Sequence, residues 1–163
     1  MKRFLVLCSA FLFSGLLVGC GSDSRVGLVK DTTGMIETAA SNVGNIKTRV
    51  DDAVKEASGG KKLDLSQAIE ATKELKVTGD KAQEIRRKIE RVRASITDEE
   101  KKTYAESEKS KLTAAFEDLK TQKEQLRVAL ADAEKLPGNA KNEVKTLREK
   151  IIEAESPFEA LSR

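Results

Sequence analysis

Apolar residues recur at steps of three and four through most of the chain from Met35 onward. This spacing places them on one face of an α-helix. The first stripe comprises Ile36, Ala39, Val43, Ile46, Val50, Val54 and Ala57. It stops before Ser58-Gly59-Gly60, and glycines are typical just beyond a helix end. The pattern therefore predicts a first helix that begins near Met35 and ends at these glycines.

A second helix is predicted to follow Asp64-Leu65-Ser66-Gln67, a sequence that resembles a capping box. Its stripe comprises Leu65, Ala68, Thr72, Leu75, Ala82, Ile85, Ile89, Val92 and Ile96. Gly79 lies inside this stretch, where glycine costs about 1 kcal/mol relative to alanine, and Asp80 after it can cap a new helix. The pattern leaves open one continuous helix or a break near Gly79.

Two further helices are predicted in the last third of the chain. Thr97-Asp98-Glu99-Glu100 forms a second capping box, and the helix after it stops before Pro137-Gly138-Asn139. Its stripe comprises Tyr104, Leu112, Ala115, Leu119, Leu126, Ala129, Ala133 and Leu136. A shorter helix carries Val144, Leu147, Ile151 and Ala154. It is expected to stop at Ser156-Pro157.

These stripes predict an all-α fold, an elongated antiparallel helical bundle or coiled-coil hairpin of three to four helices. The second and third helices would be roughly 48 and 58 Å long, against about 35 and 25 Å for the outer two. We therefore expect a long central helix pair whose turn at Ile96–Thr97 projects as a two-helix finger. The bundle would occupy residues 35–155, and residues 156–163 would form a C-terminal tail in which Phe158 and Leu161 fold back.

The N-terminus has the features of a secretory signal peptide. Lys2 and Arg3 supply a positive start, and residues 4–17 form an apolar run. That run would span roughly 21 Å as a helix, which is short of the ~30 Å hydrocarbon core of a bilayer. A signal peptide over residues 1–19 is therefore favoured over a transmembrane helix.

The apolar run ends in Leu17-Val18-Gly19-Cys20, which resembles the lipobox of bacterial lipoproteins. The resemblance implies that the Cys20 thiol receives a diacylglyceryl group, that the Gly19–Cys20 bond is cleaved, and that the new amine is acylated. Two or three acyl chains would hold the protein at a membrane permanently. The alternative is a chance cysteine at an ordinary cleavage site. Cys8 lies within the predicted signal peptide and is interpreted as one more apolar residue of the segment that is removed.

The segment after the cysteine is rich in Gly, Ser, Asp and Thr and lacks a clear helical period. Residues 20–34 are therefore predicted to be the lipidated cysteine and a flexible tether. The residue after Cys20 is Gly21 rather than Asp. By the sorting rule of enteric lipoproteins, the resemblance then favours the outer membrane over the inner membrane of the bacterial cell envelope.

The composition argues against catalysis and against several classes of binding. The chain has no histidine and only two cysteines, which removes the commonest general base and the usual zinc ligands. We expect no enzyme activity, no metal and no cofactor beyond the lipid on Cys20. Loss of residues 1–19 leaves 28 basic against 27 acidic residues, so the mature chain has no basic excess for nucleic acid.

One basic cluster is a candidate for contact with an anionic membrane surface. It comprises Arg86, Arg87, Lys88, Arg91 and Arg93. Glu84 and Glu90 are interleaved with it at spacings that form ordinary ion pairs on a helix. A solvated helix face is therefore the favoured alternative.

These observations together predict a lipid-anchored, non-catalytic helical protein that acts as a spacer, scaffold or protein-binding module. The alternative is an inhibitor or immunity-type binding protein for an envelope enzyme, which an exposed apolar groove on the bundle would favour. The expected partners are the membrane, through the lipid anchor, and an envelope protein or a second copy of the chain.

Overall fold

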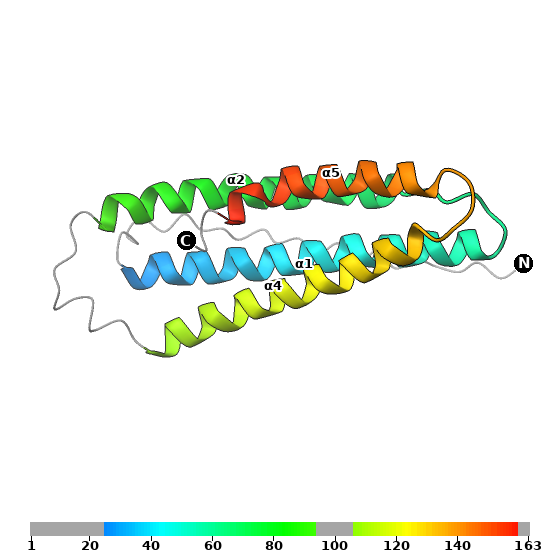
Figure 1. Cartoon of the computed structure of the whole chain (residues 1–163). Coiled ribbons are helices and arrows are strands. Elements are labelled where there is room, and N and C mark those ends of the chain that lie inside the picture. The colour runs from blue at the N-terminus through cyan, green and yellow to red at the C-terminus, as the bar shows by residue number, and fades with distance from the viewer. Residues whose placement is uncertain (1–24, 94–105, 160–163) are drawn as a thin grey trace, which may run out of the picture.

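The computed structural model describes residues 25–93 and 106–159. They form helices α1 (Arg25–Ser58), α2 (Ser66–Arg93), α4 (Glu106–Ala133) and α5 (Ala140–Glu159) (Figure 1). These four helices pack along their length into one elongated bundle, and the described ranges contain no strand. The predicted all-α helical bundle is confirmed.

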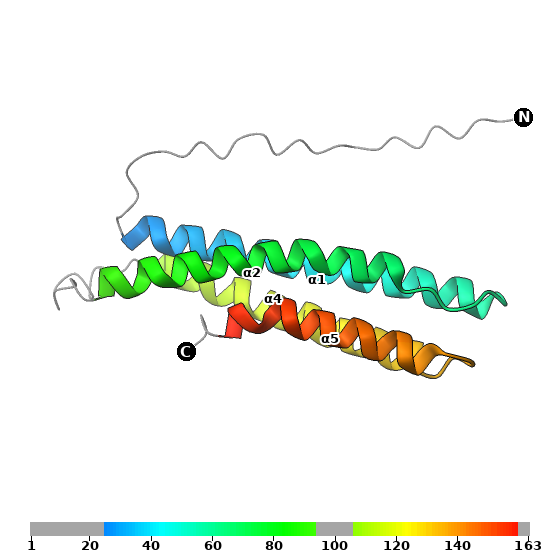
Figure 2. The same ribbon diagram turned by 90° about the horizontal axis from the view of Figure 1, so that it is seen from above.

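The bundle consists of two helical hairpins, α1–α2 and α4–α5, each antiparallel (Figures 1 and 2). Helix α1 packs against both α2 and α4, and α2 also packs against α5. The α1–α4 and α2–α5 pairs each run in the same direction (Figure 1). The arrangement is thus antiparallel within each hairpin and parallel where the hairpins meet. The backbones of α4 and α5 approach each other least closely of the neighbouring pairs.

The first helix begins ten residues earlier than predicted, at Arg25 rather than Met35. Residues 25–34 are therefore helical, and the expectation of a flexible tether over residues 20–34 is wrong for this part. Leu28 and Val29 are each only 5% exposed. Thr32 Oγ1 donates to the Leu28 carbonyl oxygen at 2.6 Å, and Thr33 Oγ1 donates to the Val29 carbonyl oxygen at 2.9 Å. These hydroxyl groups are satisfied within the helix, so the two threonines can face inward with the apolar residues.

Helix α1 is longer than predicted because it begins at Arg25. Over the described residues α1 has 34 residues, and α2 and α4, which adjoin residues 94–105, have 28 each. At one end of the bundle α1, α2 and α4 all extend past the end of α5 (Figures 1 and 2). Within the described residues, three helices therefore form this end. The Ile96–Thr97 turn and the capping box after it lie outside the described residues.

Helix α2 is continuous from Ser66 to Arg93, so the break considered near Gly79 does not occur. Gly79 is buried because it faces α5: a Cβ built on it would lie 2.8 Å from the Ala154 carbonyl oxygen. The glycine permits a close approach of two backbones rather than interrupting the helix. At the start of α2, the Ser66 N–H donates to Asp64 Oδ1 at 2.9 Å. Gln67 does not complete the capping box, because its Oε1 accepts from Arg49 of α1.

The two hairpin turns each contain a glycine with positive φ, Gly60 at 96° and Gly138 at 85°. After α1, the Gly60 N–H donates to the Ala57 carbonyl oxygen and the Lys61 N–H to that of Glu56. This pair of bonds is a Schellman motif, which fits the predicted end of the first helix.

Helix α5 continues through Pro157 to Glu159, so residues 156–159 belong to the bundle rather than to a tail. Pro157 packs against the surface of α2 at Gly79, and Phe158 is 6% exposed. These contacts hold the last turn against the bundle. Leu161 lies outside the described residues.

The core largely follows the predicted stripes. Predicted stripe residues that are buried include Ile36, Val43, Ile46, Val50, Leu65, Leu75, Ala82, Leu126, Val144 and Leu147. Buried residues that the stripes did not include are Leu28, Val29, Met35, Ala40, Leu63, Leu130 and Ala140. Most of the additional residues lie on α1, which packs on two neighbours and therefore buries a wider face.

Candidate functional site

Cys20, which is expected to carry the lipid, and Gly19, which precedes the expected cleavage site, lie outside the described residues. The structure does place the helix that follows them. Cys20 precedes the first residue of α1, Arg25, by five positions. Five residues can span at most about 18 Å. A lipid on Cys20 would therefore hold the N-terminal end of α1 near the bilayer.

The basic cluster lies at this same end of the molecule. Arg86, Arg87 and Lys88 are on the last turns of α2, and all three side chains are exposed. The start of α1 and the end of α2 lie side by side in both views (Figures 1 and 2). Arg91 and Arg93 belong to the same helix, and their side chains lie outside the described part.

The inward face of α2 becomes more exposed to solvent toward Arg86. The inward face of α2 runs through Leu75, Gly79 and Ala82, all of which are buried. Arg86 continues this stripe by a step of four residues, yet its side chain is exposed. Helix α5, which packs on this face, ends before α2 does (Figure 1). Ile85, three residues after Ala82, is still partly buried against the core, so Arg86 lies at the exposed edge of the inward face.

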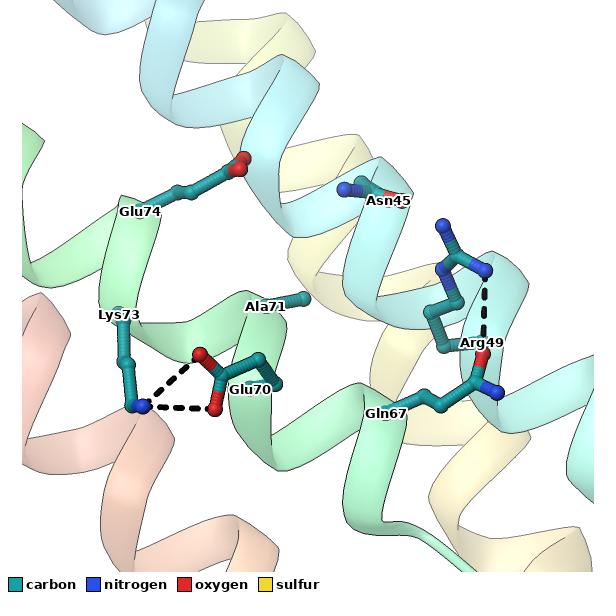
Figure 3. Close-up of a pocket in the computed structure, with 7 residues that line it drawn as sticks. All are labelled: Asn45, Arg49, Gln67, Glu70, Ala71, Lys73 and Glu74. Carbon is teal, nitrogen blue, oxygen red and sulfur yellow. Dashed lines mark hydrogen bonds and ion pairs between the residues drawn. The ribbon is translucent and has the colours of Figure 1, made fainter. Parts of the chain in front are cut away.

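A shallow groove with a volume of about 310 Å³ lies between α1 and α2 (Figure 3). Its lining residues are Asn45, Arg49, Gln67, Glu70, Ala71, Lys73 and Glu74. At one end, Arg49 Nη1 donates to Gln67 Oε1 at 3.1 Å, which joins the two helices. At the other end, Glu74 reaches from α2 toward α1 (Figure 3).

Most side chains that line the groove are polar or charged, and one of its two carboxylates, Glu70, is paired with a cation. Lys73 Nζ lies 2.7 Å from Glu70 Oε2, so this pair forms one wall of the groove. Both side chains are about 70% exposed, with values of 71% and 69%. The polar side chains of this surface can form hydrogen bonds with a partner. The groove was not foreseen because it arises from the pairing of two helices rather than from either sequence segment.

The clearest electrostatic interaction between helices joins α2 and α5. Lys76 Nζ lies 2.6 Å from Glu153 Oε1, and Lys150 Nζ lies 3.1 Å from Glu153 Oε2. Hydrogen bonds from Lys76 and then Lys150 lower the pKa of Glu153 below its ordinary value. The same contact with Glu153 raises the pKa of Lys76. Both groups are therefore held in their charged forms at neutral pH.

Two more carboxyl groups are held ionised by hydrogen bonds. The pKa of Asp64 is lowered by hydrogen bonds from the backbone and side chain of Ser66, and that of Glu124 by a hydrogen bond from Arg127. The pKa values of these carboxyl groups are thus lowered, which favours the charged form. A general acid needs a raised pKa instead.

Helices α4 and α5 are linked by ion pairs rather than by close backbone packing. Lys123 Nζ lies 2.9 Å from Glu155 Oε2, and Arg148 Nη1 lies 2.8 Å from Glu134 Oε1. The Glu155 side chain is only 15% exposed, so this pair is partly shielded from solvent. Long side chains therefore fill the wider space between these two helices.

Three large apolar side chains in the described part of the chain are exposed. They are Val77 on α2, Val128 on α4 and Ile152 on α5, and each is more than four-tenths exposed.

Nowhere in residues 25–93 and 106–159 do three acidic or cysteine side chains gather closely enough to bind a metal ion. Within the same ranges, none of the helices combines the length and hydrophobicity needed to cross a bilayer.

Comparison of the chain with known protein families, with curated proteins and with solved structures finds no significant match.

Proposed function

We propose that this chain is a lipid-anchored, non-catalytic helical protein of the bacterial cell envelope that acts as a spacer, scaffold or protein-binding module. The observation that carries the proposal is the short distance in sequence between the lipobox-like cysteine, Cys20, and the first residue of a 34-residue helix. A helix of this length is about 51 Å long. A lipid on Cys20 would fix one end of this bundle at a bilayer. The mechanism would then be to hold the remaining helical surface at a set distance from the membrane.

The non-catalytic part of the proposal is supported by the chemistry of the charged groups. The chain has no histidine, and the carboxyl groups of Asp64, Glu124 and Glu153 have lowered pKa values because they accept hydrogen bonds on the surface. These groups stay ionised at neutral pH and are poor general acids.

The alternative role, an inhibitor or immunity-type binding protein for an envelope enzyme, would be favoured by an exposed apolar groove. Six of the seven residues that line the groove between α1 and α2 have polar or charged side chains. The spacer or scaffold role therefore remains the first proposal. The residue after Cys20, Gly21, favours the outer membrane as its location.

The anchor is tested by replacing the cysteine. Cys20→Ala is expected to release the tagged full-length protein from the membrane fraction after a high-salt wash. Cys8→Ala is the matched control, because Cys8 would be removed with the signal peptide, and this variant should stay in the membrane fraction. Retention of Cys20→Ala at the level of the control would contradict the lipid anchor.

The partner is tested by crosslinking the tagged full-length protein in cells and identifying what it captures. One dominant envelope protein would support a protein-binding module. Crosslinks only to the chain itself would support a self-associating spacer and would direct attention to its oligomeric state.

A further inference from the structure

We propose that the end of the bundle formed by the start of α1 and the last turns of α2 docks on an anionic membrane surface through Arg87 and Lys88. This inference rests on the lipid anchor at Cys20 proposed above, and it adds an orientation and a second attachment to it. The lipid headgroups would be the ligand.

The start of α1 lies close in sequence to the proposed anchor. Arg25 follows Cys20 by five positions, so an anchored chain would hold the start of α1 within about 18 Å of the lipidated residue. The last turns of α2 lie beside the start of α1 (Figures 1 and 2). The anchored chain would therefore allow the exposed basic residues of α2 to reach the headgroups.

The charge of this end is predominantly basic. Arg86, Arg87 and Lys88 are three consecutive exposed cations, and residues 86–93 together contain five basic residues and one acidic residue, Glu90. Near an anionic leaflet, each basic residue changes the ratio of docked to undocked states by about fivefold. The attraction falls off within a Debye length of about 8 Å at physiological salt, so it acts on side chains that lie at the headgroup layer.

Burial also decreases along the inward face of α2 toward this end. Leu75 and Ala82 are buried, Ile85 is partly buried against the core, and Arg86 beside it is exposed. Apolar packing thus gives way to exposed charge toward the end of α2. Such an end suits the headgroup layer and does not suit the hydrocarbon core.

The test measures the orientation of the lipidated protein on vesicles. Once Cys8 is removed and Cys20 carries its lipid, an introduced cysteine is the only free thiol. Gln83→Cys places a dye on α2 near the basic end, and Lys62→Cys places it in the turn at the opposite end, roughly 25 Å further along the bundle. Energy transfer to labelled headgroups is measured with phosphatidylcholine vesicles and with vesicles that also contain phosphatidylglycerol.

We expect stronger transfer from residue 83 than from residue 62, with the difference larger on the vesicles that contain phosphatidylglycerol. Arg87→Gln with Lys88→Gln should reduce the docked-to-undocked ratio by roughly 25-fold and bring the two labels closer in transfer efficiency. The matched control, Lys141→Gln with Lys145→Gln, removes two exposed lysines of α5 at the opposite end and should change nothing.

Equal transfer from the two labels, or no response to Arg87→Gln with Lys88→Gln, would overturn the docking while leaving the anchor standing. Failure of the protein to float with either kind of vesicle would overturn the anchor itself, and this inference with it.

Discussion

The carbonyl oxygen of Ala154 on α5 lies 2.8 Å from where a Cβ on Gly79 of α2 would be, and Cγ of Pro157 lies 3.1 Å from the same point. The two helices approach so closely here that no side chain fits between them. Lys76, three residues before Gly79 on α2, forms an ion pair with Glu153 of α5. This ion pair fixes the register of α5 along α2. The short helix α5 is thus docked on α2 by one close contact and one charge pair.

Gly79→Ala is expected to destabilise the protein by about 1–3 kcal/mol, because backbone atoms of α5 must move to admit the methyl group. This loss outweighs the gain of about 1 kcal/mol that alanine brings to a helix interior. Urea denaturation followed by circular dichroism measures the change. Gly34→Ala is the control, since nothing lies within 4 Å of a Cβ there, and it should stabilise the protein. Equal stabilisation by both substitutions would contradict the close contact.

The early start of α1 gives a second prediction. Leu28 is 5% exposed in the structure, whereas a tether would leave it in solvent. Leu28→Ala should therefore lower the free energy of unfolding by about 2 kcal/mol or more. Lys30→Ala, at an exposed position two residues later, should change it by less than about 0.5 kcal/mol. Similar small effects for both variants would mean that residues 25–34 do not pack on the bundle.

The helical periodicity of the sequence was sufficient to predict the fold class and most of the core. The periodicity did not predict buried positions that are occupied by polar residues. Thr32 and Thr33 are buried because their hydroxyl groups donate to carbonyl oxygens of their own helix. Gly79 looks like a helix breaker but serves a contact with α5, which is distant in sequence. Pro157 looks like a helix end but packs against α2.

The site was less predictable than the fold. The basic cluster was visible as a run of charges, but its position beside the start of α1 depends on the folding back of α2 along α1. The groove lined by Asn45, Arg49 and Gln67 depends on the same pairing. Neither helix alone carries a pattern that predicts these arrangements, because both come from contacts across the hairpin.

A third prediction concerns the ionisation of Glu153. Because hydrogen bonds from Lys76 and Lys150 lower its pKa in the folded state, this group stabilises the protein above the ordinary carboxyl range near pH 4.3. That contribution is lost as the pH falls through the lowered pKa. Lys76→Gln should raise the pKa of Glu153 more than Lys150→Gln, since the Lys76 contact is shorter, at 2.6 against 3.1 Å. Carboxyl chemical shifts followed by NMR over a pH series measure this order, and the reverse order would contradict it.

The last prediction concerns a polar contact between α1 and α2. Asn42 Nδ2 donates to Thr78 Oγ1 at 3.0 Å, and Thr78 is only 6% exposed. Thr78→Val keeps the shape of the side chain but leaves the Asn42 amide without this acceptor, which should cost about 1–3 kcal/mol. Thr72→Val is a matched control, because Thr72 is 5% exposed and its hydroxyl group bonds to the carbonyl oxygen of Ile69 in its own helix.

The contribution of the pair itself comes from a double-mutant cycle with Asn42→Ala. If the contact couples the two helices, Thr78→Val should be less costly by about 0.5–1 kcal/mol when Asn42 is already alanine. Thr72→Val should cost the same in both backgrounds, because Thr72 Oγ1 does not bond to Asn42. Additive effects of Thr78→Val and Asn42→Ala would mean that apolar packing alone sets the register of α1 on α2.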